Sequence, residues 1–95
     1  MHARVTRFEG PPSDVDKGIK LIKDEIVPSA KKMRGFKHGY WLVDRATGKG
    51  IAMTLFDSEA SMRASESDAE QSRARATQIG SRIVGVERYE VIVEA

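Results

Sequence analysis

Four segments of the chain alternate apolar and polar residues, which is typical of β-strands. They span residues 3–8, 36–44, 51–56 and 82–94. Between the second and third, residues 44–50 carry turn-forming side chains, and Gly48 is free to adopt a positive φ, so these two strands are predicted to form a hairpin. Gly85 interrupts the last and longest strand, where it predicts a bulge.

Two other segments repeat apolar residues every three or four positions, as an amphipathic helix does. The first is predicted to begin at Ser13 and end at Gly35, with a kink near residues 24–28 because Pro28 removes a backbone donor. The second is capped by Asp57 or Ser58 and ends at Gly80. Its predicted inner positions are Met62, Ser65, Ala69, Ser72, Ala76 and Ile79.

The resulting order, strand-helix-strand-strand-helix-strand, predicts a ferredoxin-like α+β fold in one domain spanning residues 1–95. Such a fold is a four-stranded antiparallel sheet with two helices on one face and with the first and third strands in the centre. Both faces of this sheet carry apolar residues. In the third strand, Ile51, Met53 and Leu55 lie on one face, and Thr54 and Phe56 lie on the other. Because two helices cover one face only, we expect a second copy of the chain to cover the other, as a homodimer.

The composition limits the classes of binding partner and the cellular compartment to be expected. Sixteen basic and 14 acidic side chains are interleaved and leave a net charge of +2, without the basic face that nucleic-acid binding requires. No apolar run approaches the roughly 18 residues needed to span a membrane. The chain has no cysteine, which excludes disulfides and favours the reducing cytoplasm.

Three stretches give the chain a resemblance to a known superfamily. They are Arg4-Val5-Thr6-Arg7-Phe8, Gly35-Phe36-Lys37-His38-Gly39-Tyr40-Trp41-Leu42-Val43-Asp44-Arg45, and Thr54-Leu55-Phe56-Asp57-Ser58-Glu59. Over essentially its whole length the chain resembles the dimeric α+β barrel superfamily, in particular its antibiotic biosynthesis monooxygenase-like branch. The resemblance implies an apolar pocket between helices and sheet, in which a deprotonated aromatic substrate reduces dioxygen without metal or flavin. It therefore implies no cofactor.

The sequence departs from that family at the residues that carry its chemistry. The quinone-forming and haem-opening relatives use an asparagine, and this chain has none. Haem-opening relatives also need a histidine on a helix, whereas His2 and His38 both lie on predicted strands. A catalytic zinc normally takes three protein ligands, and these two histidines lie on strands that are not neighbours, so no metal site is expected.

The remaining candidate residues lie on the second and last strands. His38 and Tyr40 share one strand face, so an imidazole base and a phenol could meet the same substrate as catalytic residues. The same pair is also typical of side chains that cover a dimer seam. Trp41, on the opposite face, is a candidate ligand-binding residue, although its residue type favours an interface anchor. Arg88 is a candidate for binding an acidic ligand.

Three possibilities stay open at this point, and the third of them is a dimer module that binds no ligand. The first is an oxidoreductase, a cofactor-independent monooxygenase acting on a small aromatic or polyketide-like molecule. The second is a non-catalytic dimeric barrel that binds a small ligand or serves a stress response. A closed apolar cavity with His38 or Tyr40 pointing into it would favour the enzyme.

Overall fold

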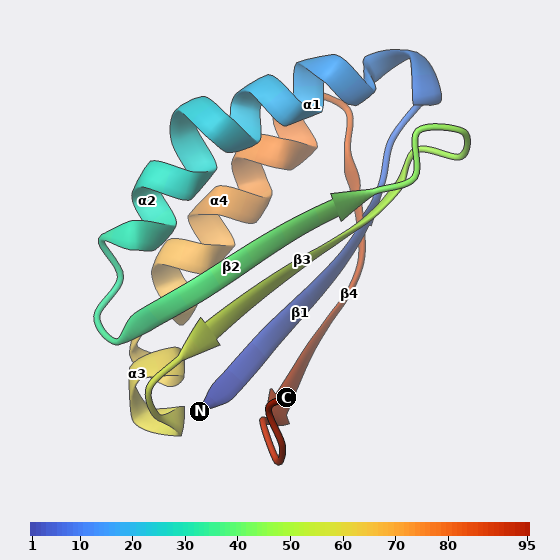
Figure 1. Ribbon diagram of the computed structural model, residues 1–95. Coiled ribbons are helices and arrows are strands. Elements are labelled where there is room, and N and C mark those ends of the chain that lie inside the picture. The colour runs from blue at the N-terminus through green and yellow to red at the C-terminus, as the bar shows by residue number, and fades with distance from the viewer.

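The computed structural model describes all of residues 1–95 and places four strands in one antiparallel sheet (Figure 1). The strands run in the order β2-β3-β1-β4. Their bounds are His2–Glu9 for β1, Phe36–Val43 for β2, Lys49–Phe56 for β3 and Arg82–Glu90 for β4. The predicted ferredoxin-like topology is confirmed, with β1 and β3 central and β2 and β4 at the edges.

The first helical segment is one bent rod made of several pieces. After a short 3-10 turn (Pro12–Asp14) it continues as α1 (Val15–Leu21), a π-helical stretch (Ile22–Ile26) and α2 (Val27–Lys31). Within the π stretch the amide of Val27 donates to the carbonyl of Ile22, five residues back. The missing amide of Pro28 explains why the winding widens here, as predicted from the sequence.

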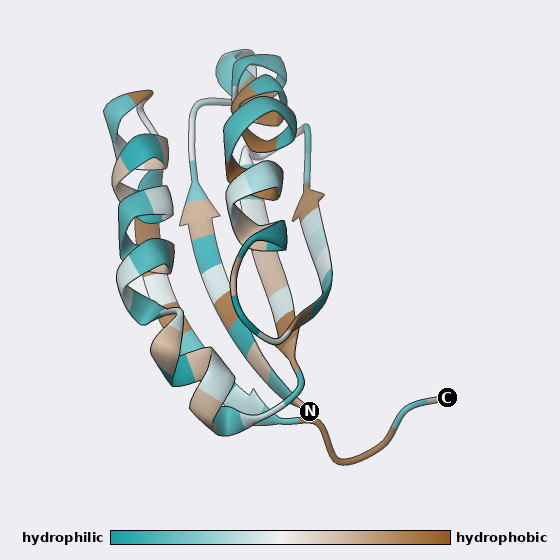
Figure 2. Ribbon diagram, turned by 90° about the vertical axis from the view of Figure 1, so that its left-hand side faces the viewer, coloured by the Kyte–Doolittle hydropathy of each residue, from teal (hydrophilic) through white to brown (hydrophobic).

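The second helical segment consists of α3 (Glu59–Ala64) and α4 (Glu66–Gln78). Ser58 caps it, because its hydroxyl accepts a hydrogen bond from the amide of Ser61 at 3.1 Å. The two helices are separated at Ser65, and Gly80, with a φ of 100°, follows the end of α4. Figure 2 shows both helical segments on the same side of the sheet. None of the helices combines the length and the apolar character needed to cross a membrane.

The helix-facing side of the sheet holds the buried core. Met33, Phe56, Met62 and Ala69 pack together there, and Phe36 leans its ring edge against Phe56 at 6.0 Å between centroids. The sequence predicted Phe36 on the same face as His38. The structure shows otherwise, because the register of β2 against β3 shifts between these two residues. The bulge turns Phe36 inward and leaves His38 on the other face.

The predicted length of the last strand is wrong in part. β4 ends at Glu90 rather than Glu94, since residues 91–95 have no neighbouring strand beyond one bond from the Val91 amide to the Met1 carbonyl. The predicted bulge in this strand is confirmed: Arg7 faces Gly85 and Phe8 faces Ile83, so Val84 is the extra residue. Ile92 and Val93 in the tail are almost fully exposed.

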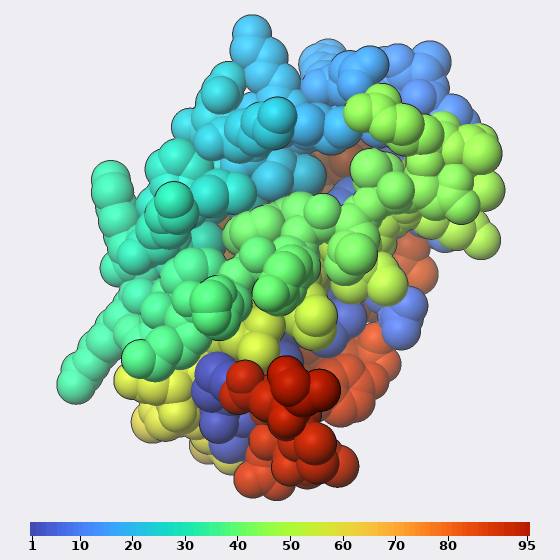
Figure 3. Space-filling view, viewed as in Figure 1, coloured from blue at the N-terminus to red at the C-terminus, as the bar shows by residue number.

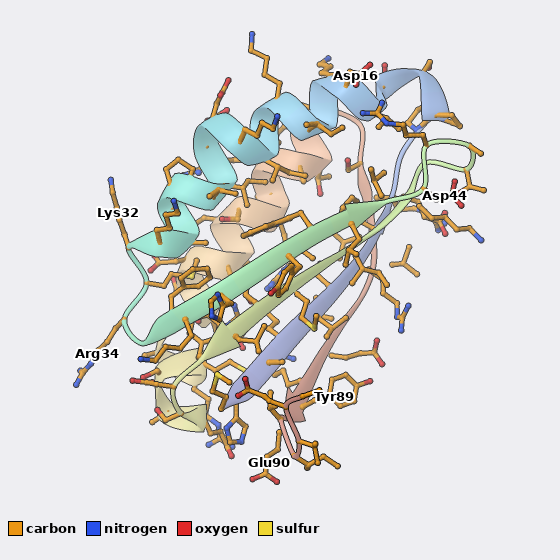
Figure 4. All side chains as sticks on the ribbon, in the orientation of Figure 1. Asp16, Lys32, Arg34, Asp44, Tyr89 and Glu90 are labelled. Carbon is orange, nitrogen blue, oxygen red and sulfur yellow. The ribbon has the colours of Figure 1, made fainter.

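The other side of the sheet is uncovered in the single chain. Tyr40, Leu42, Val84 and Tyr89 are each half-exposed on or beside it. Figure 4 labels Tyr89, near the end of β4 that lies farthest from α1. An apolar face of this kind is the feature from which a homodimer was predicted, and we refer to it below as the open face.

Candidate functional site

A cavity of about 100 Å³ lies between the sheet and the two helical segments. The cavity exists because small side chains on the sheet and on α4 leave the space between them unfilled. Strands β1 and β3 contribute Thr6, Ala52 and Thr54, while α4 contributes Ala69 and Ala76. The inner positions predicted for the second helix are therefore confirmed as facing the sheet. The rest of the lining includes larger apolar residues, namely Phe8, Leu21, Ile22, Ile26, Trp41, Ile79 and Ile83.

A second pocket of about 280 Å³ adjoins this cavity and shares Phe8, Gly18, Ile22 and Trp41 with it. It reaches the turn between β2 and β3. There the guanidinium of Arg45 donates to Asp16 of α1 at 3.0 Å, which ties the turn to the helix. Figure 4 shows Asp16 and the turn residue Asp44 at the same end of the molecule. In the space-filling view this region is a hollow between the atoms of α1 and those of β2 (Figure 3).

Arg4 forms a charged part of the cavity wall, although it is only 3% exposed. Its guanidinium donates to the carbonyl of Met62 at 2.8 Å, the hydroxyl of Ser65 at 2.7 Å and the carboxylate of Glu66 at 3.1 Å. It also lies 5.3 Å from the ring centre of Phe56, a cation–π distance. The break between α3 and α4 places this carbonyl and this hydroxyl together, and so gives the buried cation its partners.

Glu66 is shared between two arginines. Its carboxylate accepts two bonds of 2.7 Å from Arg88 in addition to the bonds from Arg4. The hydrogen bond from Arg88, followed by the charge and hydrogen bond of Arg4, lowers the pKa of Glu66 from 4.5 to about 2, although partial burial opposes the shift. Burial in turn lowers the pKa of Arg4, while the neighbouring Glu66 opposes that effect. The carboxylate is thus ionised and fully occupied at neutral pH.

Two further polar groups on the wall have no partner. The Nη1 atom of Arg73 and the hydroxyl of Ser72 are both enclosed, and neither makes a hydrogen bond within the protein. Both residues line the cavity from successive positions on α4. Enclosed donors without acceptors are rare because each one costs free energy. They are the feature of this cavity that most directly indicates a polar ligand group.

The four site residues predicted from the sequence are not brought together. Trp41 lines the cavity, and its two predicted roles, ligand-binding residue and interface anchor, stay predictions. His38 and Tyr40 pair with Leu55 and Met53 and share their face, the open face. Alternation along β2 requires this, because adjacent residues point to opposite sides. Neither residue lines the cavity, so the prediction that they act on a ligand there loses its geometric basis.

Arg88 lies near the cavity, but its guanidinium is bonded to Glu66. Its guanidinium is engaged by Glu66 at two positions, and it does not line the cavity. In the single chain it holds Glu66, and its predicted binding of an acidic ligand stays a prediction. Sequence reasoning missed Arg73, since an arginine on an amphipathic helix gives no signal until the packing is known. The histidines, aspartates and glutamates form no group of three close enough to hold a metal ion.

Known proteins resemble this chain in sequence and in fold. An uncharacterised protein of Mycobacterium tuberculosis is 31% identical over 91 residues, which is 96% of this chain and 39% of that protein. The chain thus spans about 39% of the length of that relative. No protein-family model matches the sequence.

Several solved structures have the same fold as this chain. A putative antibiotic biosynthesis monooxygenase from Deinococcus radiodurans superposes with a TM-score of 0.77 at 13% identity, covering 100% of this chain and 95% of the other. A monooxygenase from the gene ActVA-Orf6 of Streptomyces coelicolor, bound to nanaomycin D, superposes with a TM-score of 0.69 at 12% identity. That match covers 99% of this chain and 91% of the other. These matches confirm the fold that the resemblance predicted.

Proposed function

We propose that this chain, which has the ferredoxin-like fold of the antibiotic biosynthesis monooxygenase-like α+β barrel proteins, binds a small aromatic or polyketide-like molecule between its helices and sheet and oxidises it with dioxygen. One observation carries the proposal: an apolar cavity with Trp41 in its wall and two unpartnered donors. Together with the adjoining pocket of about 280 Å³, this cavity is mostly apolar with a few polar groups, as small-molecule sites usually are.

The proposed reaction needs no cofactor to balance. A phenol with a free para position and one molecule of dioxygen give the para-quinone and one molecule of water. One oxygen atom enters the ring, the other leaves as water, and the substrate supplies all the electrons. The contribution of the protein is then to exclude water and to orient the ring, which apolar walls and a tryptophan face can do.

A second function, non-catalytic ligand binding, is favoured by a different observation. The cavity lining contains arginines as its only ionisable residues, with no histidine, carboxylate, lysine or tyrosine. A phenol with an ordinary pKa near 10 would therefore find no base in the cavity to remove its proton at neutral pH. A binding protein needs no such base, so this function stands beside the first.

We further propose that two copies associate through the open face and that the protein works in the cytoplasm. Tyr40, Leu42 and Tyr89 would then become buried against the partner. Isolated sheets of this kind rarely leave a broad apolar face in water.

Gly18 provides the sharpest test of the site. It lines the cavity and the adjoining pocket, and an added Cβ would meet nothing within 4 Å. Gly18→Leu should therefore fill the site while stabilising α1 by about 0.5–1 kcal/mol, because leucine is a better helix former. We expect it to abolish binding of two-ring aromatics, followed by quenching of Trp41, the single tryptophan of the chain.

Oxygen consumption separates the two functions. Hydroxylated aromatics that bind the wild type and consume dioxygen, but do neither with Gly18→Leu, support the monooxygenase. Binding without oxygen uptake supports the non-catalytic protein. If no aromatic compound binds the wild type, or if Gly18→Leu binds as well as the wild type, the cavity is not the site and both functions are rejected.

A further inference from the structure

Positive charge exceeds negative charge at one wall of the cavity. The charged groups that act on Arg4 are Glu66, Arg73 and Arg88. With Arg4 itself this makes three cations and one anion, a net charge of +2. The single carboxylate is already bound by Arg4 and Arg88. Arg73 forms no ion pair, so it is the cation of this group whose charge no protein side chain balances.

The unpartnered donors point to the same chemistry. The Nη1 atom of Arg73 and the hydroxyl of Ser72 come from adjacent residues of α4, and both are enclosed. A guanidinium and a hydroxyl are both donors, and a guanidinium has no capacity to accept. A group with two acceptor oxygens and a negative charge would satisfy both donors and offset the excess charge.

The lining also decides which anion fits. A carboxylic acid with an ordinary pKa near 4 enters already ionised at neutral pH, whereas a phenol near 10 must first lose its proton. Because the lining holds no base, the anion must arrive preformed. The remaining lining is apolar and includes Leu21, Ile26 and Trp41, which suits a ring rather than an extended polar chain.

We propose that the cavity binds a small aromatic carboxylate, with the carboxylate oxygens accepting hydrogen bonds from the Arg73 guanidinium and the Ser72 hydroxyl and with the ring against Trp41. This inference rests on the proposed function only in that the cavity is the ligand site. It adds the charge of the ligand and the residues that select it. Arg73 and Ser72 are thus binding residues that determine specificity.

The test compares three probes that share one ring system. They are 2-naphthoate, which is an anion at pH 7, and 2-naphthamide and 2-naphthol, which are neutral. Quenching of Trp41 and titration calorimetry give their dissociation constants. We expect naphthoate to bind about tenfold or more tightly than the amide, since a hydrogen bond to a charged group is much stronger than a neutral one.

Variants on α4 assign that preference to a residue. Arg73→Gln should remove the preference for naphthoate and leave the affinity for naphthamide within about twofold, because only the charge-dependent part of binding is lost. Arg75→Gln is the matched control. It removes the same charge from the same helix at a residue outside the cavity lining, and we expect it to bind as the wild type does. Ser72→Ala should weaken naphthoate binding by a smaller factor.

A measurement without ligand guards against misfolded variants. Only the Nη1 atom of Arg73 is enclosed, so replacing this side chain removes one unpaired donor, and the melting temperature of Arg73→Gln should stay close to that of Arg75→Gln. Equal affinities for naphthoate and naphthamide, or an unchanged preference in Arg73→Gln, would overturn the carboxylate proposal while leaving the cavity as an aromatic site. If none of the three probes binds, the site itself fails and the proposed function fails with it.

Discussion

The two faces of the sheet are built from the same strands, but polar groups are buried on one face and exposed to solvent on the other in the single chain. On the helix side, Arg4 is almost completely buried, and the break between α3 and α4 supplies the carbonyl and the hydroxyl to which it donates. On the open face, the ion pair of Arg7 with Glu87 and the hydrogen bond of Tyr89 to Glu87 lie in contact with solvent. Adjacent residues of one strand, such as Tyr40 and Trp41, are thus placed in different environments.

This difference in burial separates the residues that we propose bind a ligand from those that we propose form an interface with a second copy. Polar groups enclosed on the helix side either bond to the protein, as the Nε and Nη2 atoms of Arg4 do, or lack a partner, as the Nη1 atom of Arg73 does. In the single chain the polar groups of the open face are in contact with water, so their pairing there indicates no ligand site. The exposed aromatic residues of that face instead suit an interface with a second copy.

The largest effect should come from removing the shared carboxylate. Glu66→Gln leaves Arg4 buried with its charge uncompensated, which should cost about 3 kcal/mol of unfolding free energy. Glu87→Gln is the matched change on the open face, where Arg7 is exposed in the single chain, and a much smaller loss is expected at protein concentrations low enough for the chain to be monomeric. Urea unfolding at pH 7 measures both. Equal losses in the two variants would contradict the contrast between the faces.

The same carboxylate should make stability depend on pH in acid. Its pKa is about 2 in the folded protein and 4.5 ordinarily, so the folded state binds the proton more weakly than the unfolded state. The stabilisation is therefore complete above about pH 4.5 and is lost as pH falls from there towards 2. Unfolding free energies across this range should converge for the wild type and Glu66→Gln. A gap that stays constant down to pH 2 would show that Glu66 titrates normally.

Neighbouring aromatic residues on β2 should respond differently to truncation. Trp41→Ala removes a half-buried ring from the cavity wall and should cost about 2 kcal/mol at any protein concentration, less than a fully buried tryptophan. Tyr40→Ser acts on the open face, so we expect it to weaken association and to make the melting temperature more dependent on protein concentration. Sedimentation at several concentrations measures the second effect. Tyr40→Ser that sediments as the wild type does would remove this residue from the interface.

The smallest effect is expected from His38, which sequence reasoning named as a candidate base. His38 lies on the open face, so His38→Ala should leave ligand affinity at the cavity and any oxygen uptake unchanged. The comparison with Gly18→Leu uses the same assays and the same substrates. A loss of turnover in His38→Ala at unchanged affinity would restore its predicted catalytic role and require a path from the open face.

The sequence by itself determined the elements, their order and the sheet topology, because local rules govern them. Alternation along a strand, apolar spacing along a helix, the cap at Ser58 and the distortion before Pro28 all depend on residues near one another in the chain. The bulge at Gly85 belongs to the same group. Even the placement of Trp41 and His38 on opposite faces of β2 follows from the alternation of side chains along a strand.

Only the tertiary structure decided which of those two faces meets the helices, because alternation is the same whichever face is buried. It also decided that Phe36 turns inward, since that depends on a bulge set by the pairing of β2 with β3. The candidate site depends on still more distant contacts. Arg4, Glu66 and Arg73 come from a strand and a helix some 60 residues apart, where Glu66 bonds to Arg4 and Arg88 while the Nη1 atom of Arg73 has no partner. No local pattern encodes such a difference, because it arises from which side chains the packed chain leaves without partners.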